Sequence, residues 1–322
     1  MKQQTQSAAP PVSVRALRKT WPGGVEAVRG IDFDVASGEV FGLLGPNGAG
    51  KSTTIGMLTT TVVPTSGHAR LAGFDVARDA ISARAVSGVV FQDAVVDRAL
   101  TGRRNLETHA ALWGVERAAI ASRVNGLARD FGISDLLDRA VGTYSGGQLR
   151  RLEIARALVS EPYVLFLDEP TVGLDPRIRH ELLDLIAGLR RRTGMTVVLT
   201  THYLDEAEHL CDRVAVMHEG AIVALDSPAN LLAAVGPKVL ELRVDRDDAT
   251  EPTLRRLRDE GIAGDDAFVI GSTITVPIHA DRVAGDPLAR LAELDLRTSA
   301  AATRPPTLDD VYLRLTGDRI AA

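Results

Sequence analysis

Cysteine is almost absent from this sequence of 322 residues, and long apolar segments are missing altogether. The single cysteine, Cys211, excludes an intrachain disulfide and a cysteine-rich metal site, and it fits a reducing compartment. Apolar stretches such as 164–167 and 197–199 have the length of strands, and no window reaches the roughly 18 apolar residues of a membrane span. Residues 1–13 lack the apolar core of a signal peptide. We therefore expect a short flexible lead over residues 1–11 and a protein that stays inside the cell.

The sequence also lacks an excess of basic residues. It contains 37 lysines and arginines against 42 aspartates and glutamates, a formal net charge of −5. Proteins that bind nucleic acid through its phosphates normally carry a basic surface, so we expect no nucleic-acid partner. The hydrophobic share of 45% and the charged share of 25% are typical of a folded globular protein. At about 150 residues per domain, the length indicates two domains.

Short apolar runs alternate with longer helical patterns through the first two thirds of the chain. This alternation predicts an α/β domain with a largely parallel sheet. The expected strands are 39–44, 87–92, 163–167, 195–200 and 213–217, and the expected helices are one from Lys51 onward, 145–160, 177–192 and 204–211. Residues 101–137 have a helical pattern with no strand, which indicates a helical subdomain over about 95–160.

The pattern changes at residues 233–237. Beyond this point the expected strands are 239–244 and the β-rich stretch 268–278 with a turn at Gly271-Ser272, and the expected helices are 250–260, 282–294 and 308–315. We therefore predict an α/β domain over 12–236 and a small α+β domain over 237–322.

Glycine is concentrated in one segment directly after the expected strand 39–44. The segment is Gly45, Pro46, Asn47, Gly48, Ala49, Gly50, Lys51 and Ser52, followed by Thr53. It fits the phosphate-binding pattern G-x-x-x-x-G-K-[ST] between a strand and a helix, the context that this pattern requires. Backbone N–H groups of such a loop converge on phosphate oxygens. We expect Lys51 to reach the β- and γ-phosphates, Ser52 to bind Mg²⁺ and Thr53 to add a phosphate contact.

Two carboxylates, Asp168 and Glu169, follow the apolar run of the expected strand 163–167. A buried carboxylate is costly unless it is paired or holds a metal ion. We expect Asp168 to act as an outer ligand of Mg²⁺, and Glu169, which points away from it, to polarise an attacking water. An exposed turn at a strand end is the plain structural alternative, and the phosphate loop upstream disfavours it.

A second glycine-containing helix start precedes these carboxylates by about twenty residues. It consists of Ser145, Gly146, Gly147 and Gln148, with Ser145 as a good N-cap. In this order with the phosphate loop and the carboxylates, it resembles the signature motif of the ATP-binding cassette (ABC) family. The resemblance covers about residues 12–232.

The resemblance to the ABC family implies roles for four further residues. Gln92 matches the glutamine that touches Mg²⁺ or the water and relays to the membrane partner. Asp175, in Gly173-Leu174-Asp175, matches the D-loop, and His202 matches the switch histidine that contacts the γ-phosphate. Trp21 lies where the family places an aromatic residue, usually tyrosine, to stack on adenine. The family's mechanism also implies a homodimer in which ATP lies between the phosphate loop of one copy and residues 145–147 of the other.

A narrower resemblance connects the chain with the daunorubicin-resistance group of drug-export ATPases. It rests on residues 144–147, 200–207 and the tail 306–317. It implies a separate membrane permease of the ABC-2 type, an exported drug, antibiotic or other hydrophobic compound, and a peripheral location on the cytoplasmic face of the membrane. Arg103-Arg104 and Gln148-Leu149 depart from the group, which often has Arg-Glu and Met-Arg there.

Other interpretations stay open at this point. The chain could be a non-transport cassette ATPase of a cytosolic complex, although it has no second cassette, no long heptad coil and no basic excess. It could also be the ATPase of an importer with a regulatory C-terminal domain. A metal site formed by His202, His209 and Cys211 is disfavoured, because their spacing matches no known ligand pattern.

Overall fold

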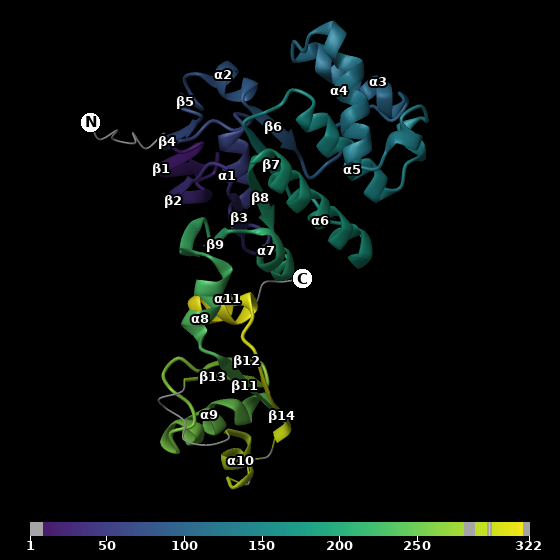
Figure 1. The fold of residues 1–322 in the computed structure, drawn as a ribbon. Coiled ribbons are helices and arrows are strands. Elements are labelled where there is room, and N and C mark those ends of the chain that lie inside the picture. Colours follow the sequence, from purple (N-terminus) through teal and green to yellow (C-terminus); the bar gives the residue numbers. More distant parts are fainter. Residues whose placement is uncertain (1–8, 280–286, 295, 297, 318–322) are drawn as a thin grey trace, which may run out of the picture. The chain divides into compact units, whose positions relative to one another are not determined.

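The computed structural model describes residues 9–279, 287–294, 296 and 298–317, and it contains two compact units (Figure 1). Unit 1 is Met1–Ile222 and unit 2 is Val223–Ala322. The sequence pattern places the division later, at 236/237. Helix α8 (Pro228–Val235) packs against α11 (Leu308–Thr316), so it lies within unit 2. Residues 1–8 of the expected lead and 282–286 of the expected helix 282–294 lie outside the described residues.

The core of unit 1 is a sheet in which five strands are the parallel strands that the sequence predicts. Its strand order is β10-β9-β3-β8-β7-β6, and β3 pairs in parallel with β8 and β9, as do β7 with β8 and β6 with β7. Every residue of β3, β7 and β8 is buried, as expected for central strands covered on both faces. The predicted strands are β3 (Val40–Leu44), β6 (Ser87–Val90), β7 (Val164–Asp168), β8 (Thr196–Thr201) and β9 (Arg213–His218). Strand β10 (Ala221–Asp226) was not predicted, and the division between the units falls within it. Helices α1 (Lys51–Leu58) and α7 (Leu204–Leu210) contact the central strands of this sheet.

A second, antiparallel sheet in unit 1 escaped the sequence analysis. Its order is β2-β1-β4-β5, with β1 (Val12–Thr20), β2 (Glu26–Val35), β4 (Ser66–Leu71) and β5 (Phe74–Asp75). The pairing of β1 with β2 shifts register between Val14 and Leu17, where Ala16 has a φ of 45°. Such a bulge interrupts the alternation of apolar and polar residues by which a strand is recognised.

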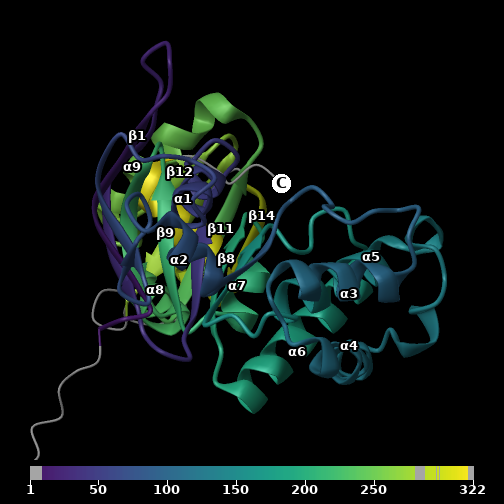
Figure 2. The same ribbon diagram turned by 90° about the horizontal axis from the view of Figure 1, so that it is seen from above.

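Helices form the inserted subdomain, as predicted, and Figure 2 shows them gathered beside the strands of unit 1. They are α3 (Gly102–Leu112), α4 (Arg117–Asp130), the short turns η1 (Ser134–Leu136) and η2 (Val141–Thr143), and α5 (Gly146–Leu158). Helix α6 (Pro176–Thr193) follows β7, and α2 (Ala80–Ala85) precedes β6. Helices α3, α4 and α6 each contact α5, so the signature helix lies at the centre of this group.

Unit 2 combines a four-stranded antiparallel sheet with helices, in agreement with the predicted α+β class. The strand order is β12-β13-β11-β14. The elements are β11 (Lys238–Val244), η3 (Asp247–Ala249), α9 (Thr250–Asp259), β12 (Phe268–Ile270), β13 (Thr273–Ile278), α10 (Pro287–Ala292) and β14 (Thr298–Arg304), in addition to α8 and α11. One face of the sheet buries Leu240, Leu242 and Ile274 against Leu254 and Leu257 of α9. Strand β14, rich in alanine, was not anticipated.

Arg304, the last residue of β14, connects three elements of unit 2. Its guanidinium donates to Asp310 Oδ2 at 2.6 Å and Oδ1 at 2.9 Å, and to Glu241 Oε2 at 2.9 Å. Asp310 is 1% exposed and also completes a capping box with Thr307 at the start of α11. Burial opposes ionisation of Asp310, but hydrogen bonds from Arg304 and Thr307 outweigh it and lower the pKa of this carboxyl.

The variant Asp310→Asn is expected to destabilise unit 2 by about 2 kcal/mol at neutral pH, because it removes charge-assisted hydrogen bonds. A lowered pKa stabilises the fold above the ordinary value of 3.8, and this contribution is lost as the pH falls through the folded pKa. The difference between variant and wild type should therefore shrink below pH 3.8. Urea unfolding with hydrogen exchange of α11 and β14 measures it. Asp259→Asn, at the exposed end of α9 in unit 2, is the control for the loss of one carboxylate; an equal effect would contradict the role of the Arg304 pair.

Candidate functional site

The phosphate loop lies between β3 and α1, in the context that the sequence predicts. Gly50 begins the helix with a φ of 102°, and a Cβ atom there would approach Ala27 O to 2.4 Å. Only glycine therefore fits this position. No side chain caps the N-terminus of α1, and its first turn contains no acidic residue. This helix start thus presents backbone N–H groups and a positive dipole end to an anion.

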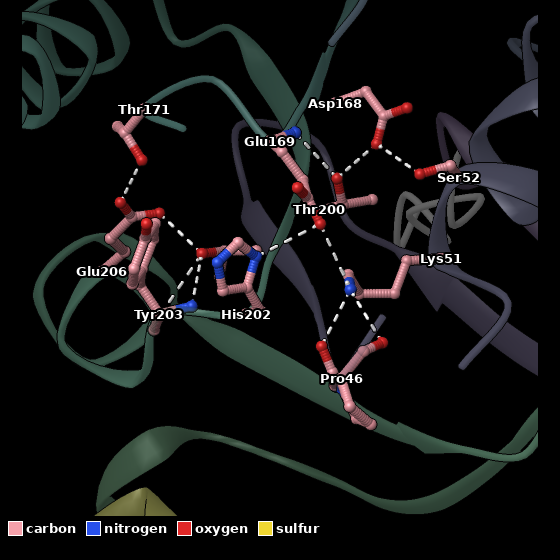
Figure 3. A network of polar contacts seen from close by, with 12 residues as sticks. Pro46, Lys51, Ser52, Asp168, Glu169, Thr171, Thr200, His202, Tyr203 and Glu206 are labelled. Atoms are coloured by element: carbon pink, nitrogen blue, oxygen red, sulfur yellow. Dashed lines mark hydrogen bonds and ion pairs between the residues drawn. The ribbon is translucent and has the colours of Figure 1, made fainter. Parts of the chain in front are cut away.

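Lys51 is the first residue of α1, and its side chain is 3% exposed. Its Nζ donates to Gly45 O at 2.8 Å and Pro46 O at 3.0 Å, and it lies 3.3 Å from Glu169 Oε1 (Figure 3). Burial lowers the pKa of this ammonium, while the carboxylates of Glu169 and Asp168 act in the opposite direction. The ammonium is thus held within the loop that would receive a phosphate group.

Asp168 ends β7 and faces a pair of hydroxyl groups. The parallel register places it beside Thr200 of β8, whose Oγ1 donates to Asp168 Oδ1 at 2.5 Å, and Ser52 Oγ donates to the same oxygen at 3.1 Å (Figure 3). Burial is the main cause that raises the pKa of Asp168. A hydroxyl and a carboxylate side by side are hard oxygen donors, so Ser52 and Asp168 suit Mg²⁺. Thr200 was not singled out from the sequence, although its place at the end of a neighbouring strand could have indicated it.

Glu169 turns away from Asp168 toward Lys51 and His202. Its backbone has a φ of 46°, an uncommon conformation for a residue with a side chain, and its N–H donates to Thr200 Oγ1 at 2.9 Å. Its Oε1 lies 3.3 Å from Lys51 Nζ and 3.3 Å from His202 Nδ1 (Figure 3). The Nδ1 atom of His202 is buried and makes no hydrogen bond to any described residue. Strained backbone of this kind clusters at functional sites, and here it accompanies a carboxylate that faces Lys51 and His202.

A cavity of about 450 Å³ opens beside these groups. It is lined by Trp21, Val25, Ala27, Asn47, Gly48, Gly50, Lys51, Ser52, Thr53, Gln92 and Glu169. Trp21 is 40% exposed in the turn after β1, with Lys19 Nζ 4.6 Å from its ring centroid. The cavity therefore brings an aromatic ring, the phosphate loop and Gln92 to one place, with a volume suited to a nucleotide. Val25 and Ala27 lie in the overlooked β1–β2 segment, where the sequence carries no motif.

The variant Trp21→Ala is expected to weaken MgATP binding about 10-fold while changing kcat by less than about 2-fold, because ring stacking on a base contributes affinity but takes no part in hydrolysis. Equilibrium titration and steady-state kinetics separate the two quantities. Trp113→Ala, in the helical subdomain, is the matched control. An unchanged affinity in Trp21→Ala would remove this residue from the site.

Residues 145–148 and Asp175 form the N-terminal caps of two helices, α5 and α6. Ser145 Oγ accepts from Gln148 N at 3.3 Å, while Gln148 Oε1 accepts from Ser145 N at 3.0 Å, a capping box that begins α5. A Cβ on Gly147 would meet Ile178 Cγ2 at 2.5 Å, so α5 and α6 approach closely there. Asp175 caps α6 by accepting from Ile178 N at 3.1 Å. The residues that line the nucleotide cavity, as far as the structure describes them, include none of residues 145–148 and not Asp175.

A buried acidic residue that the sequence analysis missed, Glu206 of α7, lies behind His202. Its Oε2 accepts from Thr201 Oγ1 at 2.6 Å, and its Oε1 accepts from Thr171 Oγ1 (Figure 3). Arg179 Nε lies 3.6 Å from the same Oε1. Burial is the main cause that raises the pKa of Glu206. The network connects the segment after β7 with the loop that carries His202. A carboxylate four residues after a histidine offers no recognisable signal in sequence.

The disfavoured metal site gains no support. Across residues 9–279 and the described parts of the tail, no group of three or more His, Cys, Asp or Glu side chains could hold a metal ion. Cys211 is buried, and His209 pairs with Asp184 at 3.0 Å. A search of the described helices also finds none that is long and apolar enough to cross a bilayer.

A phosphate loop, two carboxylates at the end of the neighbouring strand and a helical subdomain together define a nucleoside triphosphatase of the P-loop class. Comparison with known proteins narrows the class, since the family model described as ABC transporter matches residues 28–172. The chain is 41% identical over 298 residues to the daunorubicin/doxorubicin resistance ATP-binding protein DrrA of Streptomyces peucetius, covering 91% of this chain and 89% of that protein. It is also 41% identical to the Nod factor export ATP-binding protein I of Paraburkholderia xenovorans (strain LB400), covering 92% of this chain and 93% of that protein.

Solved structures agree with this assignment. Protein cbiO1 from Clostridium perfringens, part of the ABC transporter complex cbiONQ, is 28% identical with a TM-score of 0.65, covering 78% of this chain and 95% of that chain. The ATP-binding cassette MJ1267 of an ABC transporter, in its ADP conformation, is 25% identical with a TM-score of 0.60, covering 67% of this chain and 90% of that chain. The chain therefore belongs to the family of ABC transporter ATP-binding proteins, and it is an ATPase.

Proposed function

We propose that this chain is the ATP-hydrolysing subunit of a two-component exporter. Two copies bind MgATP between them and drive a separate membrane permease of the ABC-2 type, which exports a drug, an antibiotic or another hydrophobic compound. The observation that carries the export proposal is the extent of the similarity: it covers unit 2 as well as unit 1, and the relatives concerned are named for drug resistance and Nod factor export. The subunit then lies on the cytoplasmic face of the membrane, held there by its permease.

The division of site residues between two places supports a nucleotide sandwich. Trp21, Lys51 and Glu169 line one cavity, whereas residues 145–148 begin a helix that contributes nothing to that lining among the described residues. A second copy would bring its own residues 145–147 to the open side of the cavity and complete each site. Because the phosphates then collect donors from both copies, MgATP stabilises the dimer, and hydrolysis weakens it.

The residues at the cavity have separate roles in this proposal. Lys51 and the N–H groups of α1 bind and neutralise the β- and γ-phosphates, and Trp21 stacks on adenine. Ser52 and Asp168, with Gln92, hold Mg²⁺, which when bound stabilises negative charge on the phosphate oxygens. Glu169 orients the attacking water and accepts its proton, and His202 contacts the γ-phosphate beside it.

The direct test of the export proposal is purification of the tagged chain from detergent-solubilised native membranes, with mass spectrometry of the proteins that copurify. We expect a polytopic membrane protein in stoichiometric amount, absent when untagged cells are treated alike. A partner with an associated substrate-binding protein would favour an importer. A clean dimer without a membrane protein in several detergents would overturn the proposal in favour of a cytosolic ATPase.

A further inference from the structure

Helix α5, which begins with the signature motif, carries a buried ion pair that the proposed chemistry does not use. Arg150 Nη1 donates to Glu153 Oε2 at 3.0 Å, and the two side chains are 9% and 5% exposed. Burial is the largest influence on the pKa of Glu153 and raises it, while the charge of Arg150 acts in the opposite direction. A buried ion pair of this kind adds little stability compared with apolar residues of similar volume. Its presence therefore points to a role in positioning rather than in holding the fold together.

Both charged groups contact the backbone of the segment that carries Gln92. Arg150 Nη1 donates to Phe91 O at 2.8 Å, and Arg150 Nη2 donates to Gln92 O at 3.1 Å. Glu153 Oε1 accepts from Val95 N at 3.1 Å. The planar guanidinium holds two successive carbonyls while it is oriented by the carboxylate, which a lysine could not do.

The segment so held has little support of its own. Residues 91–95 follow the end of β6, form no helix or strand, and are mostly exposed. The next part of the loop is held elsewhere, since Asn105 of α3 exchanges hydrogen bonds of 2.9 Å with the backbone N–H and C=O of Asp97. The position of Gln92 at the nucleotide cavity therefore depends on α5.

We propose that Arg150 and Glu153 form a clamp that positions Gln92 by tying the backbone of residues 91–95 to the signature helix. This inference rests on the proposed role of Gln92 at the nucleotide. In the sandwich, residues 145–147 face the nucleotide of the partner copy while Gln92 faces the nucleotide of its own copy. The clamp makes these two elements one body, so that a movement of either site is transmitted to the other.

The test uses the paired variant Arg150→Met/Glu153→Leu in the full chain, because apolar residues of similar size preserve packing and stability while removing all three backbone contacts. We expect an unchanged thermal unfolding midpoint, faster amide hydrogen exchange at residues 91–95, and kcat reduced about 10-fold with MgATP affinity within about 2-fold. Glu181→Gln is the matched control, because Glu181 pairs at 2.9 Å with Arg151, the next residue of α5, and that pair ties α5 to α6 instead. If the paired variant does not fold, Glu153→Gln, which keeps an oxygen for Val95 N–H, should show the same changes in smaller measure.

A mutant cycle with Gln92→Ala separates positioning from a merely structural role. If the clamp acts through Gln92, the combined variant should be no slower than Gln92→Ala alone, within about 2-fold. The clamp would be overturned if the reductions in kcat caused by the paired variant and by Gln92→Ala multiplied in the combined variant. It would also be overturned if amide hydrogen exchange at residues 91–95 were unchanged in the paired variant. If Gln92→Ala hydrolyses MgATP at the wild-type rate, the proposed role of Gln92 fails, and with it the positioning inference. If no membrane protein copurifies with the chain but the mutant cycle gives the expected result, the export proposal alone is overturned.

Discussion

Replacing Lys51 by alanine is expected to reduce MgATP hydrolysis at least about 100-fold. The ammonium lies at the centre of the phosphate loop, held by Gly45 O and Pro46 O and 3.3 Å from Glu169. Its charge is already desolvated before the substrate arrives, because the side chain is 3% exposed. A phosphate group would replace these contacts with a stronger one, and the negative charge that develops during transfer would be stabilised without reorganisation.

Steady-state hydrolysis and equilibrium nucleotide binding should both be measured for Lys51→Ala, since the lost charge weakens binding as well as turnover. Lys238→Ala is the control, because Lys238 begins β11 in unit 2 and is exposed. Thermal unfolding excludes a folding defect as the cause. A Lys51→Ala variant with near-normal ATPase activity would contradict the assignment of the phosphate loop.

Exchanging Glu169 for glutamine is expected to separate binding from hydrolysis. The amide preserves the size of the side chain and the strained backbone, but it cannot accept a proton from the attacking water, so kcat should fall about 100-fold or more. MgATP should still bind, because Lys51 keeps its contacts to the loop carbonyls and Trp21 is unaffected. Slow hydrolysis then leaves the nucleotide in place, and the closed dimer accumulates.

Light scattering checks the second part of this expectation. With saturating MgATP, the mass of Glu169→Gln should double from the 34.3 kDa of one chain, whereas nucleotide-free protein should not change. Glu161→Gln, an exposed glutamate shortly before β7, is the control for the loss of one carboxylate. A Glu169→Gln variant that stays monomeric at saturating MgATP would count against the sandwich.

The sequence is most informative where one short segment carries its own structural requirement. The central strands could be found because each contains a run of apolar residues, as is typical of strands buried on both faces. The phosphate loop could be found because close backbone approach demands glycine, as at Gly50, where any Cβ would meet Ala27 O at 2.4 Å. Ser145 could be identified as a helix cap because the capping residue and its partner Gln148 lie three positions apart.

The sequence is least informative where the deciding contact joins segments that are distant along the chain. The sheet of β1, β2, β4 and β5 has a bulge near Ala16 that interrupts its pattern, and with it Val25 and Ala27 escaped notice. Thr200 reaches Asp168 through the pairing of β7 with β8, and no local pattern records that pairing. The same holds for α8, which joins unit 2 through its packing against α11.

The sequence by itself thus identifies the reactive residues of this protein, whereas the orientation of each reactive side chain depends on the tertiary structure. A phosphate loop, an acidic pair and a signature helix are local, because each must satisfy its own backbone geometry. The partners of each carboxylate come from strands and helices far apart in the chain. The same is true of the hydrogen bonds by which Arg150 and Glu153 bind the backbone of residues 91–95. Side chains meet there only after the parallel sheet has set the register and the helices have packed.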